Sequence, residues 1–230
     1  METLYPLLAI VAGYLIGSLS FAVIVSRAFG LADPRSYGSH NPGATNVLRS
    51  GNRKAALVTL ALDALKGYLP VLAVLVWGPR VGLGEGTAAW VGLAAFVGHV
   101  WPLFFRFQGG KGVATAAGVL FALNPVLGAF TLASFAIVLY FFRYVSLASI
   151  VAALFAPFFQ LLIWGADAMV LAIAIMSLLL VWRHEANIRK LLAGTESRLG
   201  QKAAVPTAPP PRSSGRGGPH GGHGHGHKHH

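Results

Sequence analysis

The sequence predicts an all-α, polytopic integral membrane protein with seven transmembrane helices, an external N-terminus and a cytoplasmic C-terminus. Hydrophobic residues make up 55% of the 230 residues and charged residues only 11%, whereas an ordinary soluble domain carries about 25% charged residues. Charged residues divide the apolar sequence into runs close to the roughly 20 residues that a helix needs to cross a bilayer. Basic residues gather between these runs, and loops rich in Lys and Arg lie on the cytoplasmic side of a membrane.

The first two predicted spans are residues 4–25 and 55–77. The first run is too long for the apolar region of a signal peptide, so we expect it to remain as a membrane anchor. The intervening segment is basic and therefore cytoplasmic, which places the N-terminus outside. The second span contains Asp63 and Lys66 on one helical face. Opposite charges inside a membrane indicate either a pair that steadies helix packing or a direct contact with substrate.

The third predicted span covers residues 87–105 and leads to a cytoplasmic turn at Lys111. The next charged residue is Arg143, after 31 uncharged residues. Asn124-Pro125 falls near the middle of this stretch, where proline and the residue before it disfavour helix. We therefore expect two shorter spans, 113–123 and 126–142, joined by an external turn.

Residues 146–163 and a segment ending at Arg183 complete the seven spans. This arrangement returns Arg143 and the basic residues after Arg183 to the cytoplasm, as the distribution of positive charge requires. A five-span alternative, in which residues 112–142 and 144–182 each cross once, also keeps the C-terminus inside. It needs a 39-residue span and an external Arg143, so the seven-span topology is preferred.

Composition divides the chain into a membrane domain, residues 1–202, and a tail, residues 203–230. The tail is rich in proline, glycine and histidine and has no apolar anchors, so we expect it to be disordered. Its histidines could bind a divalent metal adventitiously, but we predict no metal site in the membrane domain and no cofactor. The chain contains no cysteine, which excludes a disulfide framework and a thiolate nucleophile.

The net charge of +11 does not predict nucleic-acid binding. The basic residues lie in short loops beside apolar runs and not on one face of a soluble domain. Helix orientation and attraction to anionic membrane lipids are the preferred interpretation. No obligate protein partner is evident from the sequence.

The first polar cluster, residues 37–49, is dense in hydroxyls, amides and glycines and ends in an arginine. Such a segment can turn backbone N–H groups inward and offer neutral donors and one fixed charge to phosphate oxygens. The alternative is a solvated loop followed by a helix whose N-terminus is capped near Asn46. The candidate substrate-binding residues here are Ser39, Asn41, Gly43, Thr45, Asn46 and Arg49.

The second cluster, residues 109–115, is an amide-rich turn with one lysine, and its candidates are Gly109, Gly110, Lys111 and Gly112. A nucleotide P-loop requires a glycine five positions before the second of these glycines and a Ser or Thr after the lysine. The chain has Phe105 and Gly112 at those positions, which disfavours ATP or GTP hydrolysis. The alternative is a flexible turn whose lysine only orients the helices.

The third cluster contains His184 and Asn187, three positions apart on one face of a helix that leaves the bilayer. His99 approaches from the third span. Neither these histidines nor His40 is followed five residues later by aspartate, so the HxxxxD motif is absent. The clusters supply cations, hydroxyls and amides suited to binding and polarising phosphorylated substrates. A substrate with a good leaving group would lessen the need for a strong base.

In this order the clusters resemble the motifs of the bacterial acyl-phosphate-dependent glycerol-3-phosphate acyltransferases, over about residues 10–200. The resemblance implies a seven-helix enzyme of the bacterial cytoplasmic (inner) membrane whose active site faces the cytoplasm. It would transfer a fatty acyl group from acyl phosphate to the 1-hydroxyl of glycerol 3-phosphate, giving lysophosphatidic acid and inorganic phosphate for phospholipid synthesis. The residues that carry it are Gly38-Ser39 with 41–49, 63–67, Gly98-His99 with 109–115, and 184–188 with Gly194-Thr195-Glu196.

The resemblance also implies residue roles. Phosphate groups would be bound by Ser39, Thr45, Asn46, Arg49 and Lys111. His184 and Asn187 would position the glycerol hydroxyl or the reacting carbonyl, which makes them, with Lys111, the catalytic candidates. Ser146 is a further candidate contact for the acyl phosphate. The family is taken to lack a dedicated protein base, so the hydroxyl proton would pass to a substrate phosphate. His40 departs from the glycine expected between Ser39 and Asn41, where it would narrow the pocket or add a donor.

Two other function classes compete with this interpretation. A transporter or channel for a phosphorylated solute would fit the intramembrane charges and the broken helices. No internal repeat is visible, however, and the polar clusters gather on one face of the membrane and not at its midplane. A lipid-binding scaffold is the third possibility.

Overall fold

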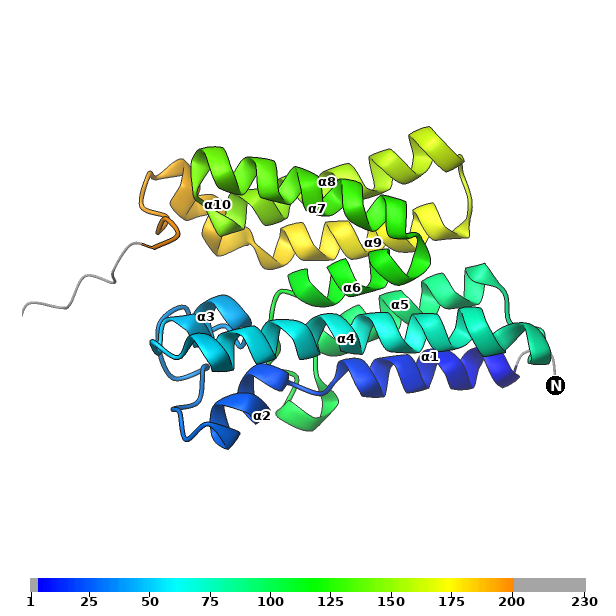
Figure 1. The fold of residues 1–230 in the computed structure, drawn as a ribbon, viewed down its shortest axis with the longest axis horizontal. Helices are drawn as coiled ribbons and strands as arrows, with labels where there is room; N and C mark the ends of the chain where they lie inside the picture. Colours follow the sequence, from blue (N-terminus) through cyan, green and yellow to red (C-terminus); the bar gives the residue numbers. More distant parts are fainter. Residues whose placement is uncertain (1–3, 201–230) are drawn as a thin grey trace, which may run out of the picture. The chain divides into compact units, whose positions relative to one another are not determined.

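The computed structural model describes residues 4–200, and every secondary-structure element within them is a helix (Figure 1). The all-helical prediction is therefore confirmed. The predicted tail, 203–230, lies outside the described residues. The α-helices are α1 (Leu4–Gly17), α2 (Phe21–Ala28), α3 (Ala44–Leu48), α4 (Arg53–Trp77), α5 (Glu85–Val100), α6 (Val113–Leu123), α7 (Pro125–Phe142), α8 (Val145–Trp164), α9 (Ala168–Arg183) and α10 (Glu185–Leu192), with 3-10 helices η1 (Gly78–Val81) and η2 (Leu103–Phe105).

The described helices provide four to six candidate membrane spans. Four are long and apolar enough by themselves: α4 with η1, α5 with η2, α7 and α8. Two more arise if α1 with α2, bent by 41°, and α9 with α10, bent by 57°, each count as one span. Helix α6 has 11 residues and extends about 16 Å at 1.5 Å per residue, about half of the hydrocarbon core. Seven spans therefore remain a prediction.

The break at Asn124-Pro125 is confirmed. Asn124 ends α6 and begins α7, and its side-chain oxygen accepts hydrogen bonds from the N–H groups of Val126 (3.0 Å) and Leu127 (3.2 Å). Pro125 occupies the first position of α7, where a helix needs no N–H donor. The predicted pair of helices, 113–123 and 126–142, agrees with the structure to within one residue.

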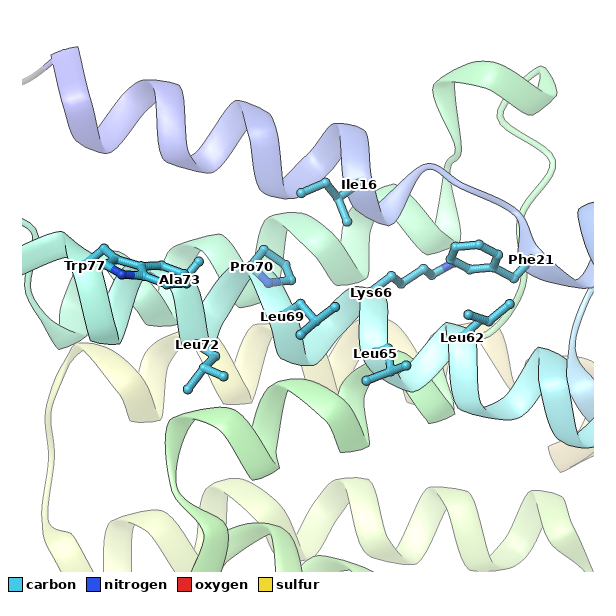
Figure 2. A pocket seen from close by; sticks show the side chains of 10 residues that line it. All are labelled: Ile16, Phe21, Leu62, Leu65, Lys66, Leu69, Pro70, Leu72, Ala73 and Trp77. Atoms are coloured by element: carbon cyan, nitrogen blue, oxygen red, sulfur yellow. The ribbon is translucent and has the colours of Figure 1, made fainter.

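The first predicted span, residues 4–25, is not one continuous helix, because the chain breaks between α1 and α2 and bends there by 41°. The Ser18 hydroxyl donates to the Tyr14 carbonyl at 2.8 Å, a local bond that competes with the helix. At the break the Leu19 carbonyl accepts a hydrogen bond from Lys66 Nζ at 2.7 Å as well as one from the Phe21 N–H at 3.1 Å. Figure 2 shows Lys66 reaching from α4 toward Phe21, the first residue of α2. A charged side chain from another helix thus stabilises the break.

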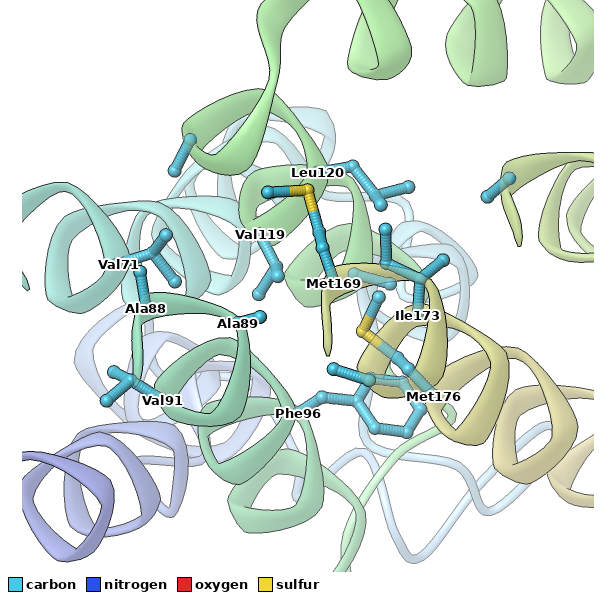
Figure 3. Close-up of a cluster of buried hydrophobic side chains, with 14 of the residues drawn as sticks. Val71, Ala88, Ala89, Val91, Phe96, Val119, Leu120, Met169, Ile173 and Met176 are labelled. Carbon is cyan, nitrogen blue, oxygen red and sulfur yellow. The ribbon is translucent and has the colours of Figure 1, made fainter. Parts of the chain in front are cut away.

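Helix α5 is central to the packing, because it contacts α1, α4, α6 and α9. Figure 3 shows the apolar core between these helices, where Val71, Phe96, Val119 and Ile173 come from α4, α5, α6 and α9. Small residues allow close helix approach in membranes. A side chain on Gly98 of α5, for example, would collide with the Tyr14 carbonyl of α1.

The arrangement of the helices brings distant segments to one end of the bundle. In Figure 1, α2, α3 and α10 lie at the same end, and the turns from α4 to α5 and from α8 to α9 lie at the other. Residues 193–199, which we call the return segment, are held at the α7–α8 turn by a hydrogen bond from Leu199 N–H to the Arg143 carbonyl (2.7 Å). The predicted polar clusters therefore share one end.

Candidate functional site

Residues 109–112, which we call the glycine turn, are held tightly between other segments. The Gly110 N–H donates to the His99 carbonyl at 3.2 Å. A Cβ on Gly110 would collide with His99 Nε2 and lie 2.8 Å from the Pro42 carbonyl. Gly112 has a φ of +82° and lies against the Phe96 ring, so it needs the conformational freedom of glycine. The turn then opens directly into the N-terminus of α6, which has no side-chain cap.

Arg183 holds the same turn from the side of α9. Its Nη2 donates to the Gly109 carbonyl at 3.2 Å and its Nε to the Gly110 carbonyl at 3.4 Å. Because both bonds engage carbonyl oxygens, the N–H groups of the turn are left to face other partners. The sequence had suggested only an orientation role for this arginine.

Lys111 is the centre of a polar network. Its Nζ donates to Asn187 Oδ1, and Asn187 Nδ2 in turn donates to Glu196 Oε1 at 2.7 Å. The Ser146 hydroxyl donates to the same carboxylate oxygen at 2.7 Å. Three predicted candidates from different parts of the chain thus meet, and Glu196 of the return segment joins them.

The surroundings of Lys111 favour an anion. Burial lowers the pKa of its ammonium to about 8, the Glu196 carboxylate opposes this shift, and the cations of Arg183, Arg49 and Lys190 reinforce it. Four basic side chains therefore act on one partly buried point, and the Glu196 carboxylate opposes them. An anionic group such as phosphate would relieve this repulsion.

Arg49, at the end of α3, reaches the return segment. Its Nη2 donates to the Ser197 hydroxyl at 3.2 Å, next to Glu196 in sequence. The side chain is exposed, so a ligand can approach it. The structure therefore brings Arg49 to the same end of the bundle as Lys111, as predicted.

His184 follows α9 and is buried, with 2% of its surface exposed. Its Nδ1 lies 2.8 Å from the Leu180 carbonyl; a carbonyl only accepts, so this nitrogen carries the proton. Burial and then the Lys111 cation lower the pKa of the imidazole to about 4. At neutral pH the ring is therefore uncharged, and its Nε2 is a hydrogen-bond acceptor.

Asn46 organises the first cluster from within. It is 2% exposed; its Oδ1 accepts from the Ser39 N–H (3.0 Å), and its Nδ2 donates to the carbonyls of Pro34 (2.6 Å) and Tyr37 (3.1 Å). It does not cap a helix, because α3 begins after Gly43 and Asn46 lies inside it. Among the other candidates, Ser39 and Thr45 are exposed, and Asn41 and Gly43 are half-buried in the loop that abuts the glycine turn.

His40 adopts a left-handed backbone conformation with a φ of +55°. Glycine adopts this region freely, which explains why a glycine was expected at this position. The His40 Nδ1 lies 3.0 Å from the Arg35 carbonyl. Its ring therefore bonds within the loop.

His99 lies beside a carboxylate and a hydroxyl, but this group is not a catalytic triad. In a triad the carboxylate and the nucleophile face opposite ring nitrogens. Here Asp63 Oδ1 (3.6 Å) and Thr115 Oγ1 (3.1 Å) both face His99 Nδ1, and Thr115 is fully buried. On its other side, His99 contacts the glycine turn at Gly110.

Two residues of the site were missed as candidates. Glu196 belongs to the motif that begins at His184, but nothing in its spacing showed that the return segment folds back onto Lys111. In the sequence, Arg183 resembles any basic residue at the end of a membrane helix. Its position directly before His184 was the one indication that it could belong to the site. Within residues 4–200, no group of three or more His, Asp or Glu side chains could hold a metal ion.

An apolar groove lies apart from this network, between α1 and α4 (Figure 2). It has a volume of about 460 Å³. Lys66 is its one charged lining residue and is engaged by Asp63 and the Leu19 carbonyl. The groove therefore offers no free cation to a phosphate. Its lining residues are Ile16, Phe21, Leu62, Leu65, Lys66, Leu69, Pro70, Leu72, Ala73 and Trp77.

Comparison with known proteins gives one consistent result. Residues 7–194 match the family model described as glycerol-3-phosphate acyltransferase. The chain is 59% identical over 205 residues to the glycerol-3-phosphate acyltransferase of Paraburkholderia phytofirmans, which covers 89% of this chain and 96% of that protein. It is 62% identical over 192 residues to that of Ralstonia nicotianae, covering 84% and 93%.

Solved structures agree with the sequence matches. The fold resembles the crystal structure of PlsY, an integral membrane glycerol 3-phosphate acyltransferase, in its glycerol 3-phosphate form. The TM-score is 0.79 at 37% identity, over 85% of this chain and 96% of that one. The lysophosphatidic acid form of PlsY gives a TM-score of 0.78 at 36% identity, over the same shares of both chains.

Proposed function

The chain belongs to the glycerol-3-phosphate acyltransferase family, and from this premise we propose that it takes the acyl group from acyl phosphate and transfers it to the 1-hydroxyl of glycerol 3-phosphate. The family resemblance drawn from the motifs is thereby confirmed, and the protein is a multi-pass integral membrane enzyme that forms lysophosphatidic acid. The donor, the position acylated and the residue roles are the proposed part.

One observation carries the proposal: Lys111, Asn187, Ser146 and Glu196 form one network beside Arg49 and Arg183. Such a site binds phosphate but offers little to activate a poor leaving group. The hydrogen bonds of His99 and His184 go to Thr115 and to a backbone carbonyl, which is not the arrangement of a nucleophile and its base. An acyl phosphate brings its own good leaving group.

The proposed reaction assigns each group a step. Lys111 and Arg49 bind phosphate oxygens, with Ser39, Asn41 and Gly43 of the loop, Thr45 of α3, and the N–H groups of the glycine turn other than that of Gly110 as neutral donors. The neutral His184 accepts a hydrogen bond from the 1-hydroxyl, and Asn187 orients the reacting carbonyl. The hydroxyl oxygen bonds to the acyl carbon, the bond from that carbon to the phosphate oxygen breaks, and the hydroxyl proton passes to a substrate phosphate oxygen. Ser146 contacts the acyl phosphate.

We propose that this site faces the cytoplasm of a bacterial inner membrane and that the chain crosses seven times. The end of the bundle that holds the site carries Arg27 in the last turn of α2, Arg49 at the end of α3, and Lys111 and Arg183 at the glycine turn. The other end carries Arg80 of η1, Glu85 at the start of α5 and Asp167 directly before α9. This asymmetry supports a cytoplasmic site.

The test uses purified protein in detergent with palmitoyl phosphate and glycerol 3-phosphate, in the presence of a metal chelator and without nucleotide or coenzyme A. We expect lysophosphatidic acid and inorganic phosphate in equal amounts. Lys111→Ala should lower turnover about 100-fold or more, because it removes a fixed cation from the site. Lys54→Ala, at the exposed start of α4, is the matched control and should behave as wild type.

Two results would contradict the proposal. Product from palmitoyl-coenzyme A but none from palmitoyl phosphate would show that the donor is wrong. Normal turnover by Lys111→Ala would remove the lysine from the mechanism.

A further inference from the structure

A buried polar network lies directly beneath the glycine turn and is not used in the proposed reaction. It consists of Asp63 and Lys66 on α4, His99 on α5 and Thr115 on α6, which we call the bracing network. Each of the four residues has 7% or less of its surface exposed. Lys66 Nζ lies 2.8 Å from Asp63 Oδ1, and His99 Nδ1 lies 3.6 Å from the same oxygen. The network therefore joins three helices inside the apolar bundle.

The Asp63 carbonyl determines which atoms donate in the hydrogen bonds of Thr115 and His99. The Thr115 hydroxyl lies 2.9 Å from the Asp63 carbonyl and 3.1 Å from His99 Nδ1. Because a carbonyl only accepts, the single hydroxyl proton goes to Asp63. His99 must then donate its Nδ1 proton to Thr115, in the direction of the Asp63 carboxylate. The imidazole orientation is thus fixed from α4 and α6 together.

The other side of His99 contacts the glycine turn in two ways. Its carbonyl accepts the Gly110 N–H at 3.2 Å, and its Nε2 lies where a side chain on Gly110 would be. Gly110 directly precedes Lys111, and the turn leads within three residues to Thr115 itself. A rotation of the imidazole would therefore change the packing against Gly110, the residue next to the phosphate-binding lysine.

The bracing network is also attached to another segment at Lys66. Lys66 donates to the Leu19 carbonyl at 2.7 Å, and its ammonium lies 5.7 Å from the centre of the Phe21 ring (Figure 2). The anchor is the break between α1 and α2, a backbone feature that cannot rotate as a side chain can. The bracing network thus extends from that break to Gly110, and the 3.6 Å contact between the Asp63 carboxylate and His99 is its one link longer than a hydrogen bond.

A role in packing alone would not require these residue types. Buried ion pairs often contribute nothing to stability compared with apolar side chains of the same size. What a buried polar network does provide is a preference for one arrangement of its members, here through the ion pair of Lys66 with Asp63 and the hydrogen bonds of the Thr115 hydroxyl. The residues whose arrangement it fixes here are those of the glycine turn.

We propose that Asp63 and Thr115 are positioning residues that act through His99 to hold the glycine turn, and with it Lys111, in the conformation that binds the phosphate of glycerol 3-phosphate. The assignment rests on the proposed function of the same site. Neither Asp63 nor Thr115 touches substrate. Their loss lowers the affinity for glycerol 3-phosphate.

The experiment compares Thr115→Val, Thr115→Ser and Asp63→Asn with the matched control Glu85→Gln. Thr115→Val is nearly isosteric and removes only the hydroxyl, whereas Thr115→Ser keeps it. Glu85→Gln removes a carboxylate from the exposed far end of the helix that carries His99. The kcat and the KM for glycerol 3-phosphate are measured at saturating acyl phosphate, together with the melting temperature in detergent.

Thr115→Val and Asp63→Asn should raise the KM for glycerol 3-phosphate about tenfold, a loss of ~1.4 kcal/mol in binding, with a smaller change in kcat. Thr115→Ser should restore a KM within about twofold of wild type, and Glu85→Gln should leave it unchanged. If Thr115→Val lowers the melting temperature but leaves the KM of the active fraction unchanged, the network is only structural and the proposal is wrong.

The rise in melting temperature that glycerol 3-phosphate causes needs no turnover. It therefore tests the positioning role of Thr115 separately from the proposed acyl transfer. Glycerol 3-phosphate should raise the melting temperature of the wild type and of Glu85→Gln, but raise that of Thr115→Val much less. An inactive wild type would overturn the donor assignment and leave this comparison intact. Equal protection of wild type and Thr115→Val would overturn the bracing role, and Thr115→Val decides the matter if Asp63→Asn does not fold.

Discussion

Lys111 is a cation in surroundings that disfavour its charge. Burial and three neighbouring basic residues lower its pKa to about 8, against about 10.4 for a free lysine. Glu196 and Asn187 hold the ammonium in place. A lysine in this state gains more from an arriving phosphate than a solvated surface lysine would, since the anion offsets a repulsion that is already present.

This pKa predicts the pH dependence of substrate binding. Because the pKa is lowered, Lys111 loses its proton as the pH rises through about 8, well before an ordinary lysine would. Glycerol 3-phosphate remains a dianion at this pH, since its second pKa is about 6. The attraction between the phosphate and Lys111 is therefore lost because the lysine becomes neutral. The KM for glycerol 3-phosphate should therefore rise steadily above about pH 8. A KM that stays constant to about pH 10 would show that the lysine keeps its proton throughout.

At the residue scale the sequence identified several of the side chains that the structure brings together. Lys111, Asn187 and Ser146 were candidates, and the structure joins them. Asn46 was expected at a phosphate, but all of its amide bonds are made within its own loop. Glu196 and Arg183 were missed because their roles depend on how the return segment and the end of α9 fold over the glycine turn. Spacing along the chain does not contain that information.

Helix boundaries depend on local chemistry in some places and on distant residues in others. The break at Asn124-Pro125 was predictable because proline and the residue before it act on their own backbone. The break between α1 and α2 was not, because Lys66 on α4 stabilises the carbonyl that the break exposes. Residues 4–25 alone read as one uninterrupted apolar helix.

The cap at Asn124 should contribute measurably to stability. Asn124→Ala removes the acceptor of two backbone N–H groups at the start of α7, which costs about 1 kcal/mol in the free energy of unfolding. Asn124→Asp keeps the acceptor and should unfold close to the wild-type temperature. Thermal unfolding of the detergent-solubilised variants tests this, and equal melting temperatures for the two substitutions would show that the side chain is not an effective cap.

The whole membrane domain is organised by the separation of its charges. The polar loops that hold the site meet at one end of the bundle, where most of the basic residues lie. The all-helical fold was predictable from composition and charge spacing. The number of crossings is harder to derive, because α6 has only 11 residues and two candidate spans are bent.

Single cysteines can test the seven-span topology, since the chain contains none of its own. Arg80→Cys, Arg106→Cys and Arg143→Cys each replace an exposed residue near a helix end. In intact cells whose outer membrane is permeable, a membrane-impermeant maleimide should label the first at once. The other two should react only after the inner membrane is opened. External labelling at position 143 would instead favour the five-span arrangement.

The pair of Asp63 and Lys66 also bears on how the protein enters the membrane during synthesis. The two residues lie one turn apart on α4 and pair within that helix, at 2.8 Å. Their charges are therefore neutralised as soon as α4 becomes helical, before any other segment has arrived. Two separate charges would each add about 2.5–3.5 kcal/mol to the cost of insertion near the bilayer centre. Because the partners share one helix, α4 can be delivered to the lipid as a nearly neutral unit, and His99 and the Leu19 carbonyl can join it later.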